Sequence, residues 1–120
     1  MSDAQEKTTG NVLQHHLESF GAGDVDALME DYTSESIVMT QTDTLVGLDA
    51  IRKFLTGLTT SVLPVGCKFE MEKSTVEGEV AFISWKAESE THKFHLGTDT
   101  FVIKDGKIAV QTLAAHMDEK

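Results

Sequence analysis

The stretch FHLGTDTFVIKDGKI, residues 94–108, contains the strongest turn signal in the sequence, the pair Asp105-Gly106. A two-residue type I′ turn needs positive φ at both central positions, and Asp-Gly is a preferred pair for it. The segments on either side, FVIK and KIAV, are rich in apolar and β-branched residues, which favour strands. The stretch therefore predicts an antiparallel hairpin between two strands of a sheet.

Asp99 is out of place in the first of these strands. Asp is depleted in strands, yet Asp99 shares a period-2 face with Phe101 and Ile103, which are expected to point into a core. Burial would raise the pKa of this carboxyl group and favour an acid that can donate a proton to a ligand. The alternatives are a structural Asp paired with a Trp or a backbone donor, or an inward charge that discourages edge pairing.

Composition limits the classes of function. The chain has 120 residues, enough for one domain with a single core. Its formal net charge of −10 argues against nucleic-acid backbones and anionic membrane surfaces as partners, because both attract clustered Lys and Arg. There is no apolar run of membrane-spanning length and no signal-peptide pattern at the start, so we expect a cytoplasmic protein. The lone Cys67 is expected to be structural.

Apolar periodicity predicts the order of the elements. Residues 1–8 are polar and are expected to be a disordered tail, followed by a single domain over residues 9–120. The predicted elements are a helix ending near Gly21, a second helix capped by Asp24, a strand over residues 36–42, a third helix over residues 48–58, and four antiparallel strands from Cys67 onward. This order predicts an α+β domain with its helices on one face of a curved sheet.

The strand near Trp85 is apolar on both faces. Val80 and Phe82 lie on one face, and Ala81, Ile83 and Trp85 lie on the other. A second copy of the chain is the simplest cover for the face away from the helices, so we expect a homodimer.

Three segments, AGDVDALMEDY, GLDAIRKF and GTDTFVIKDGKI, occur in an order and spacing that resemble the nuclear transport factor 2-like superfamily, and within it the SnoaL-like and ketosteroid isomerase-like branch. The resemblance covers the chain from about residue 10 to its end. It implies a cone-shaped, curved antiparallel sheet wrapped around three N-terminal helices. It also implies an apolar pocket between helices and sheet, and commonly a dimer through the convex face.

The same resemblance assigns the pocket residues. In the isomerase-like branch the pocket holds a base on the first strand, a Tyr on the first helix and an acid on a later strand; the matching positions here are Thr40, His16 and Asp99. Thr40 cannot act as a base at neutral pH, so the match argues against steroid isomerisation. It implies instead an acid/base role for Asp99, as in cyclase-like and dehydratase-like members. His16 is expected either to shuttle protons near neutral pH or to sit partly exposed at the pocket rim, with His15 on the far side of the helix.

Three further residues are expected to line the pocket. Gln111 offers an amide for ligand recognition, and Trp85 and Tyr32 offer apolar walls with a polar tip. No metal site is expected, because His92 and His95 are three apart on a strand. The leading hypothesis is a cofactor-free isomerase, cyclase or dehydratase that binds a small apolar or cyclic organic molecule, with Thr40 and Gln111 orienting it. The alternative is a non-catalytic ligand-binding or protein-interaction module.

Overall fold

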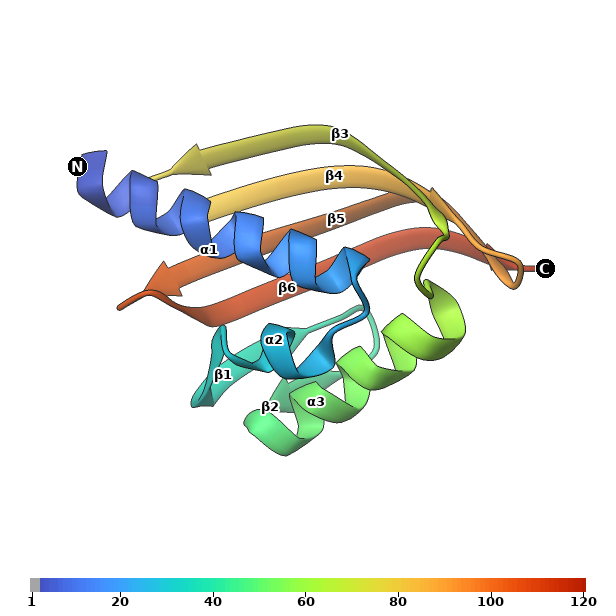
Figure 1. Ribbon diagram of the computed structural model, residues 1–120, viewed down its shortest axis with the longest axis horizontal. Coiled ribbons are helices and arrows are strands. Elements are labelled where there is room, and N and C mark those ends of the chain that lie inside the picture. Colours follow the sequence, from blue (N-terminus) through green and yellow to red (C-terminus); the bar gives the residue numbers. More distant parts are fainter. Residues whose placement is uncertain (1–2) are drawn as a thin grey trace.

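The computed structural model describes residues 3–120, which form an α+β domain (Figure 1). The helices are α1 (Asp3–Gly21), α2 (Val25–Met29) and α3 (Leu48–Gly57), and α3 runs on into a π-helical turn, η1 (Leu58–Val62). The strands are β1 (Tyr32–Met39), β2 (Thr44–Val46), β3 (Lys68–Glu77), β4 (Val80–Glu88), β5 (His92–Lys104) and β6 (Lys107–Glu119). The predicted α+β class is confirmed.

One six-stranded sheet organises the domain, in the order β2-β1-β6-β5-β4-β3. All neighbouring strands are antiparallel except β1 and β6, which are parallel. The long strands β3 to β6 curve around α1, and α2 and α3 lie beside α1 over the β1–β2 end of the sheet (Figure 1). The sheet therefore has a concave face covered by helices and a convex face without them.

The hairpin predicted at residues 105–106 joins β5 to β6. Asp105 has φ 52° and Gly106 has φ 74°, so both central residues are in the left-handed region, as a type I′ turn requires. Lys104 pairs with Lys107, and the ladder continues in antiparallel register to Asp99 opposite Leu113. This register turns Asp99 and Gln111 to the same, concave face as the fully buried Phe101.

The start of the chain differs from the prediction. The expected disordered tail over residues 1–8 is wrong from residue 3 onward, because α1 begins at Asp3; residues 1 and 2 lie outside the described part of the chain. Two contacts hold this first part of the helix against the β3–β4 turn. The Thr9 hydroxyl donates to the carbonyl oxygen of Gly78 (2.6 Å), and the Gly78 N–H donates to the Glu6 carboxylate (3.1 Å). The polar sequence gave no sign of these long-range partners.

The first strand also differs from the prediction. The expected strand was residues 36–42, whereas β1 runs from Tyr32 to Met39 and pairs with the short strand β2, which was not expected. The segment Thr33–Glu35 is polar and exposed and carries no alternation. Its pairing depends instead on Ser36, whose hydroxyl donates to the Ile108 carbonyl oxygen (2.6 Å) and accepts from the Thr33 N–H (2.8 Å).

No helix among the described residues is long and apolar enough to cross a membrane.

Candidate functional site

An apolar cavity lies between the helices and the concave face of the sheet. Its volume is about 50 Å³, which is room for a few water molecules and less than the roughly 150 Å³ of an engineered cavity that admits benzene. Its polar side chains are His16 from α1, Trp85 from β4, Asp99 from β5 and Gln111 from β6. The apolar lining comes from Leu17, Phe20, Phe54, Leu55, Leu58, Leu63, Phe69, Ile83, Phe94, Phe101 and Leu113.

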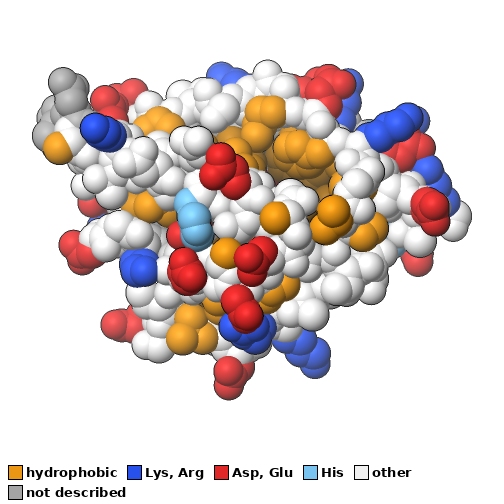
Figure 2. All heavy atoms as spheres, viewed as in Figure 1, with side chains coloured by type: hydrophobic (Ala, Val, Ile, Leu, Met, Phe, Trp, Pro, Cys, Tyr) orange, Lys and Arg blue, Asp and Glu red, His pale blue; other side chains and the backbone are white. Residues whose placement is uncertain are grey.

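The cavity adjoins a second apolar space of about 200 Å³. The two spaces share Leu17, Phe20, Leu63 and Phe69, so these four side chains separate the inner cavity from the second space. Figure 2 shows the corresponding hollow, lined by hydrophobic side chains, between α1 and the β3 side of the sheet. A ring-sized molecule can reach Asp99 along this path only if these side chains move apart.

Asp99 lies at the inner wall of the cavity and is 7% exposed. Its Oδ1 accepts a hydrogen bond from the indole N–H of Trp85 (2.8 Å), and its Oδ2 accepts one from the side-chain amide of Gln111 (2.9 Å). A carboxylate has about four lone-pair sites, so each oxygen keeps one for a bound molecule. The structure therefore combines the two interpretations of Asp99: it is paired with a Trp inside the core and it also faces a cavity.

Burial raises the pKa of Asp99 to about 6. The hydrogen bonds from Trp85 and Gln111 lower this pKa, but their effect is smaller than that of burial. Removal from water disfavours the charged form, whereas N–H donors favour it. A carboxyl group with this pKa is about nine-tenths ionised at pH 7 and still takes up a proton close to neutral pH. That is the range in which a general acid or base works well.

The position of Trp85 depends on Gly97, its partner across the β4–β5 ladder. A β-carbon at residue 97 would lie 2.3 Å from the Cζ2 atom of the indole, so only glycine lets the ring pass over β5 toward Asp99. Phe69 stacks on one part of the indole (5.4 Å between centroids), and Phe94 packs at 5.3 Å. These contacts fix the N–H group that holds Oδ1 of Asp99.

Gln111 is held in turn by Tyr32. The Tyr32 hydroxyl donates to the Gln111 side-chain oxygen, which leaves the amide nitrogen to donate to Asp99. Burial raises the pKa of Tyr32, with the charge of Asp99 adding to the effect, so the phenol stays protonated. Tyr32 is 5% exposed and lies behind the cavity lining rather than in it. Tyr32, Gln111 and Asp99 thus form a chain in which every donor points toward the carboxylate.

His16 faces the same cavity as Asp99, so the expectation that it sits partly exposed at the rim is wrong. It is 5% exposed, and its ring lies edge-on to Phe101 at 5.1 Å. Burial lowers the pKa of His16 to about 4, with the nearby His15 adding to the effect, so a role tuned near neutral pH is also wrong. Nδ1 of His16 is buried without a hydrogen-bond partner among the described residues. The ring is therefore a neutral imidazole whose buried Nδ1 is unused.

Thr40 lies outside the cavity lining, which corrects the expectation that it orients a bound molecule. A longer β1 would place Thr40 on the same face as the buried residues Ser36 and Val38, but the strand ends at Met39. Its hydroxyl instead accepts hydrogen bonds from the N–H groups of Thr42 (3.3 Å) and Asp43 (3.0 Å). Thr40 therefore stabilises the turn between β1 and β2, and the cavity has no residue at the expected base position.

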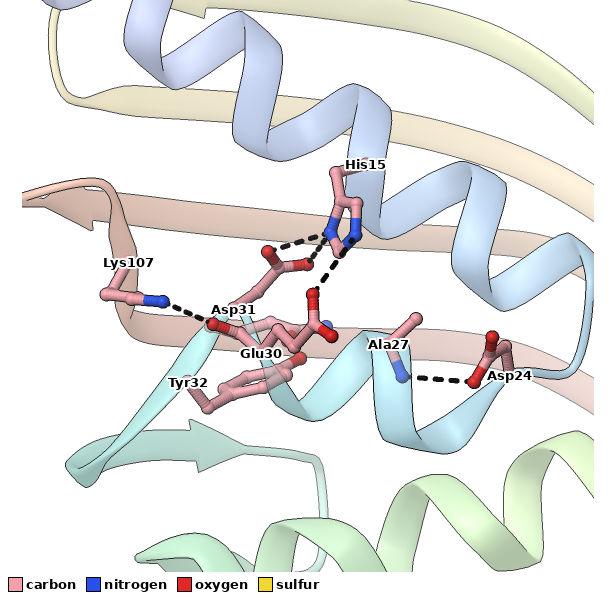
Figure 3. Close-up of polar contacts among 8 residues, drawn as sticks. His15, Asp24, Ala27, Glu30, Asp31, Tyr32 and Lys107 are labelled. Carbon is pink, nitrogen blue, oxygen red and sulfur yellow. Dashed lines mark hydrogen bonds and ion pairs between the residues drawn. The ribbon is translucent and has the colours of Figure 1, made fainter.

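A second acid–base cluster, which the sequence reasoning missed, lies outside the cavity at the junction of α1, α2 and β1 (Figure 3). Nδ1 of His15 lies 2.9 and 2.8 Å from the two carboxylate oxygens of Asp31, and its Nε2 lies 3.9 Å from Glu30. The hydrogen bond with Asp31 raises the pKa of His15, and burial raises the pKa of Asp31. Lys107 donates to the Glu30 carbonyl oxygen (2.6 Å). The sequence placed His15 on the side of the helix opposite to its apolar stripe. That position excluded His15 from the cavity, but it did not indicate Asp31 as its partner.

The comparisons with known proteins agree on the fold. A nuclear transport factor 2-like protein of unknown function from Mesorhizobium loti is 19% identical over 97% of both chains, with a TM-score of 0.81. The epoxide hydrolase/cyclase-like enzyme SalBIII, of pyran ring formation in the polyether salinomycin, is 19% identical over 100% of both chains, with a TM-score of 0.81. An epoxide hydrolase from M. tuberculosis is 10% identical over 92% of this chain and 84% of its own, with a TM-score of 0.73.

These identities are low, so the structural likeness shows the fold alone. No curated protein matches the chain. The SnoaL-like domain family matches residues 13–111, which contain the cavity residues His16, Trp85, Asp99 and Gln111. The predicted resemblance is confirmed: the chain belongs to the SnoaL-like domain family, with a nuclear transport factor 2-like fold.

Proposed function

We propose that the protein binds a small, mostly apolar organic molecule in the cavity and that Asp99 exchanges a proton with it, without a cofactor. The observation that carries the proposal is the Asp99 carboxyl group at the wall of an apolar cavity, held by Trp85 and Gln111, with a pKa of about 6. A carboxyl group that is only structural gains nothing from facing a cavity. The reaction class is isomerisation, cyclisation or dehydration, because each needs a proton removed from one atom and delivered to another.

The hydrogen bonds assign a part to each residue. At pH 7 the Asp99 carboxylate takes a proton from the bound molecule through the lone pair that Trp85 and Gln111 leave unused. Its neutral acid form then returns the proton to a second atom. His16, being neutral, can donate an N–H group to an oxygen of that molecule or accept a hydrogen bond from one of its hydroxyl groups. Gln111 and Tyr32 keep the carboxylate in place while its charge changes.

Two solved structures support ring chemistry as the class of reaction. SalBIII takes part in pyran ring formation, and the mycobacterial neighbour is an epoxide hydrolase. Both reactions act on oxygen atoms of small organic molecules. The apolar lining of the present cavity suits the carbon skeleton of such a molecule, and the four polar groups at its wall suit its oxygen atoms.

A second candidate function is ligand binding without turnover. Two observations favour it: Asp99 and His16 are the two titratable groups of the described cavity lining, and no second carboxylate joins them. With Thr40 in a turn, proton removal and proton return both depend on Asp99. A binding protein needs only the shape and the polar contacts.

The experiment that separates the two is a ligand screen followed by a conversion assay. Small cyclic ketones, phenols and epoxides are screened by thermal shift, and any compound that binds is incubated with the wild type and with Asp99→Asn and followed by NMR. Asn has the size of Asp, and a flip of the Gln111 amide restores its hydrogen bond, so Asp99→Asn is expected to keep the fold and bind the compound. The proposal predicts conversion by the wild type and none by the variant. If bound compounds are never converted, or the variant converts them equally well, the catalytic part of the proposal is wrong.

We also propose that two copies pair through the convex face of the sheet. Val80 (41%) and Leu96 (44%) are large apolar residues exposed there, and Phe82 is half-buried. Sedimentation equilibrium tests the pairing, and Leu96→Glu is expected to yield monomers. A cytoplasmic location stays a prediction of the sequence.

A further inference from the structure

A β-bulge on the convex face brings together two histidines and a carboxylate from β5 and β6. Phe94 pairs with Met117, but Leu96 pairs with His116, so β5 has one extra residue at His95. Such a bulge re-aims side chains near it. On β6, His116 and Asp118 are two apart and share the face opposite to the inward Leu113. His95, His116 and Asp118 consequently meet on the side of the sheet away from the cavity.

The three side chains are close enough to share one ion. The His95 Nε2 atom lies 2.8 Å from an Asp118 carboxylate oxygen, and the His95 and His116 rings have centroids 4.8 Å apart. One donor atom from each residue can be chosen so that all three lie within 4.8 Å of one another. Ligands about 2.0–2.2 Å from a tetrahedral zinc ion are about 3.3–3.6 Å apart. Small rotations of exposed side chains close this difference.

The donor set selects a class of ion. Two imidazole nitrogens and one carboxylate oxygen suit zinc and the neighbouring late transition metals, whereas magnesium and calcium prefer oxygen ligands alone. Asp118 supplies a carboxylate oxygen, and it already contacts His95. The chain as a whole carries a net charge of −10, which attracts cations. Lys93 lies opposite Asp118 in the ladder, so its ammonium group competes with a metal ion for the Asp118 carboxylate.

We propose that His95, His116 and Asp118 form a binding site for one divalent transition-metal ion of the zinc class. Each histidine supplies one ring nitrogen and Asp118 one carboxylate oxygen. His95 can ligate through Nε2, and the ion then takes the place of the present His95–Asp118 contact. Three protein ligands leave the fourth position of a tetrahedral ion open to water. The site is independent of the cavity, because none of its residues lines that space.

Isothermal titration of the full chain with zinc chloride at about pH 7.5 tests the site. The proposal predicts one zinc ion per chain with a dissociation constant in the micromolar range, and no binding of magnesium at the same concentration. His116→Ala and His95→Ala are each expected to weaken zinc binding at least about tenfold. The matched control is His92→Ala: His92 lies on the same strand with its Nδ1 2.7 Å from the Thr91 hydroxyl, outside the group. It is expected to leave the affinity unchanged.

Three outcomes would overturn the site: no zinc binding by the wild type, undiminished binding by His116→Ala, or one ion per two chains, which would place the ion between copies. His116 and Asp118 are exposed, so these substitutions are not expected to unfold the protein. The NMR signal of the Trp85 indole N–H, which reports the cavity, checks this directly. An unchanged indole signal together with lost zinc binding assigns the effect to the convex face.

Discussion

His15 and His16 are neighbours in sequence and opposites in environment. His16 points into the cavity, and burial lowers its pKa to about 4; His15 points outward to Asp31, and that hydrogen bond raises its pKa. A rotation of about 100° around α1 separates the two. The comparison teaches that the same side chain is a neutral group on one side of the helix and can become a cation on the other, because only His15 is partly exposed to water and hydrogen-bonded to a carboxylate.

The two carboxyl groups differ in the same way. Asp99 has neutral donors, Trp85 and Gln111, and no cation among its hydrogen-bond partners, whereas Asp31 has a histidine that can carry charge. Neutral donors hold Asp99 in place but leave its pKa near 6. Burial raises the pKa of Asp31 as well, but the contact with His15 lowers it in part. The cavity therefore keeps a carboxyl group that can change its protonation state close to pH 7.

The largest expected effects are on how stability depends on pH. The pKa of Asp99 is raised in the folded state, so between about pH 4 and 6 the folded protein binds the extra proton and stability falls as pH rises. Asp99→Asn removes that fall. Relative to wild type, the unfolding free energy of this variant is expected to increase by about 2 kcal/mol from pH 4 to pH 6.5. Urea unfolding at a series of pH values measures it, and parallel curves for the two proteins would contradict a raised pKa.

His16 is expected to act with the opposite sign over the same range. Its folded-state pKa is lowered, so the unfolded state binds the extra proton and stability rises from pH 4 to 6.5. Relative to wild type, His16→Gln is expected to lose about 3 kcal/mol over this interval. In the wild type the two slopes largely cancel. Urea unfolding of the double variant is a control, since its difference from wild type should be nearly independent of pH.

Gly97→Ala tests the steric basis of the cavity network. The new methyl group would meet the Trp85 ring at 2.3 Å, and we expect a loss of about 1–3 kcal/mol together with displacement of the indole from Asp99. Gly10→Ala is the matched control, because it is in α1 with no atom within 4 Å of the new carbon. The control is expected to gain up to about 1 kcal/mol from helix propensity. Thermal unfolding of both variants gives the comparison, and equal stabilities would show that Gly97 is not required.

Tyr32→Phe removes the donor that orients Gln111. The buried Gln111 oxygen is left without its partner, which costs about 1–2 kcal/mol. Because the Gln111 amide is then less well held against Asp99, the carboxylate loses stabilisation and the pKa of Asp99 is expected to rise. Calorimetry and the pH titration of the Trp85 indole signal measure the two effects. A titration that stays unchanged would show that Tyr32 does not act through Gln111.

His15→Ala is expected to have the smallest effect, under about 1 kcal/mol, because the His15 side chain is 42% exposed and salt screens the pair. The raised pKa of His15 means that the charged pair stabilises the fold at low pH and is lost as pH rises through that pKa. The loss should therefore be larger at pH 6 than at pH 9 and should shrink in salt. Gln14→Ala, an exposed neighbour on α1, provides the control.

The sequence was most informative where local chemistry and periodicity agreed. Asp105-Gly106 predicted the hairpin, and the period-2 alternation predicted that Asp99 shares an inward face with Phe101. The inward direction of Gln111 was predicted by the family resemblance. The place of Thr40 could not be predicted, because it depends on β1 ending at Met39, three residues before the end of the predicted strand.

The remaining differences come from partners distant in sequence. The helix over residues 3–8 depends on Gly78, and the position of Asp31 opposite His15 depends on how β1 leaves α2. The contact of His95 with His116 and Asp118 depends on a bulge. The spacing of His92 and His95 along β5 showed that these two side chains do not share a site. It could not show which residues of β6 would lie opposite them. Contacts of this kind are set by tertiary pairing and leave no local pattern.

The central claim is that Asp99 is a buried acid that titrates near neutral pH and touches Trp85. Trp85 is the sole tryptophan of the chain, so its indole N–H gives a single signal in a proton–nitrogen NMR spectrum, and that N–H donates to Asp99. We predict that this signal shifts with a midpoint at about pH 6 in the wild type and does not titrate in Asp99→Asn. A midpoint near the ordinary Asp value of about 4, or the same titration in the variant, would contradict the account.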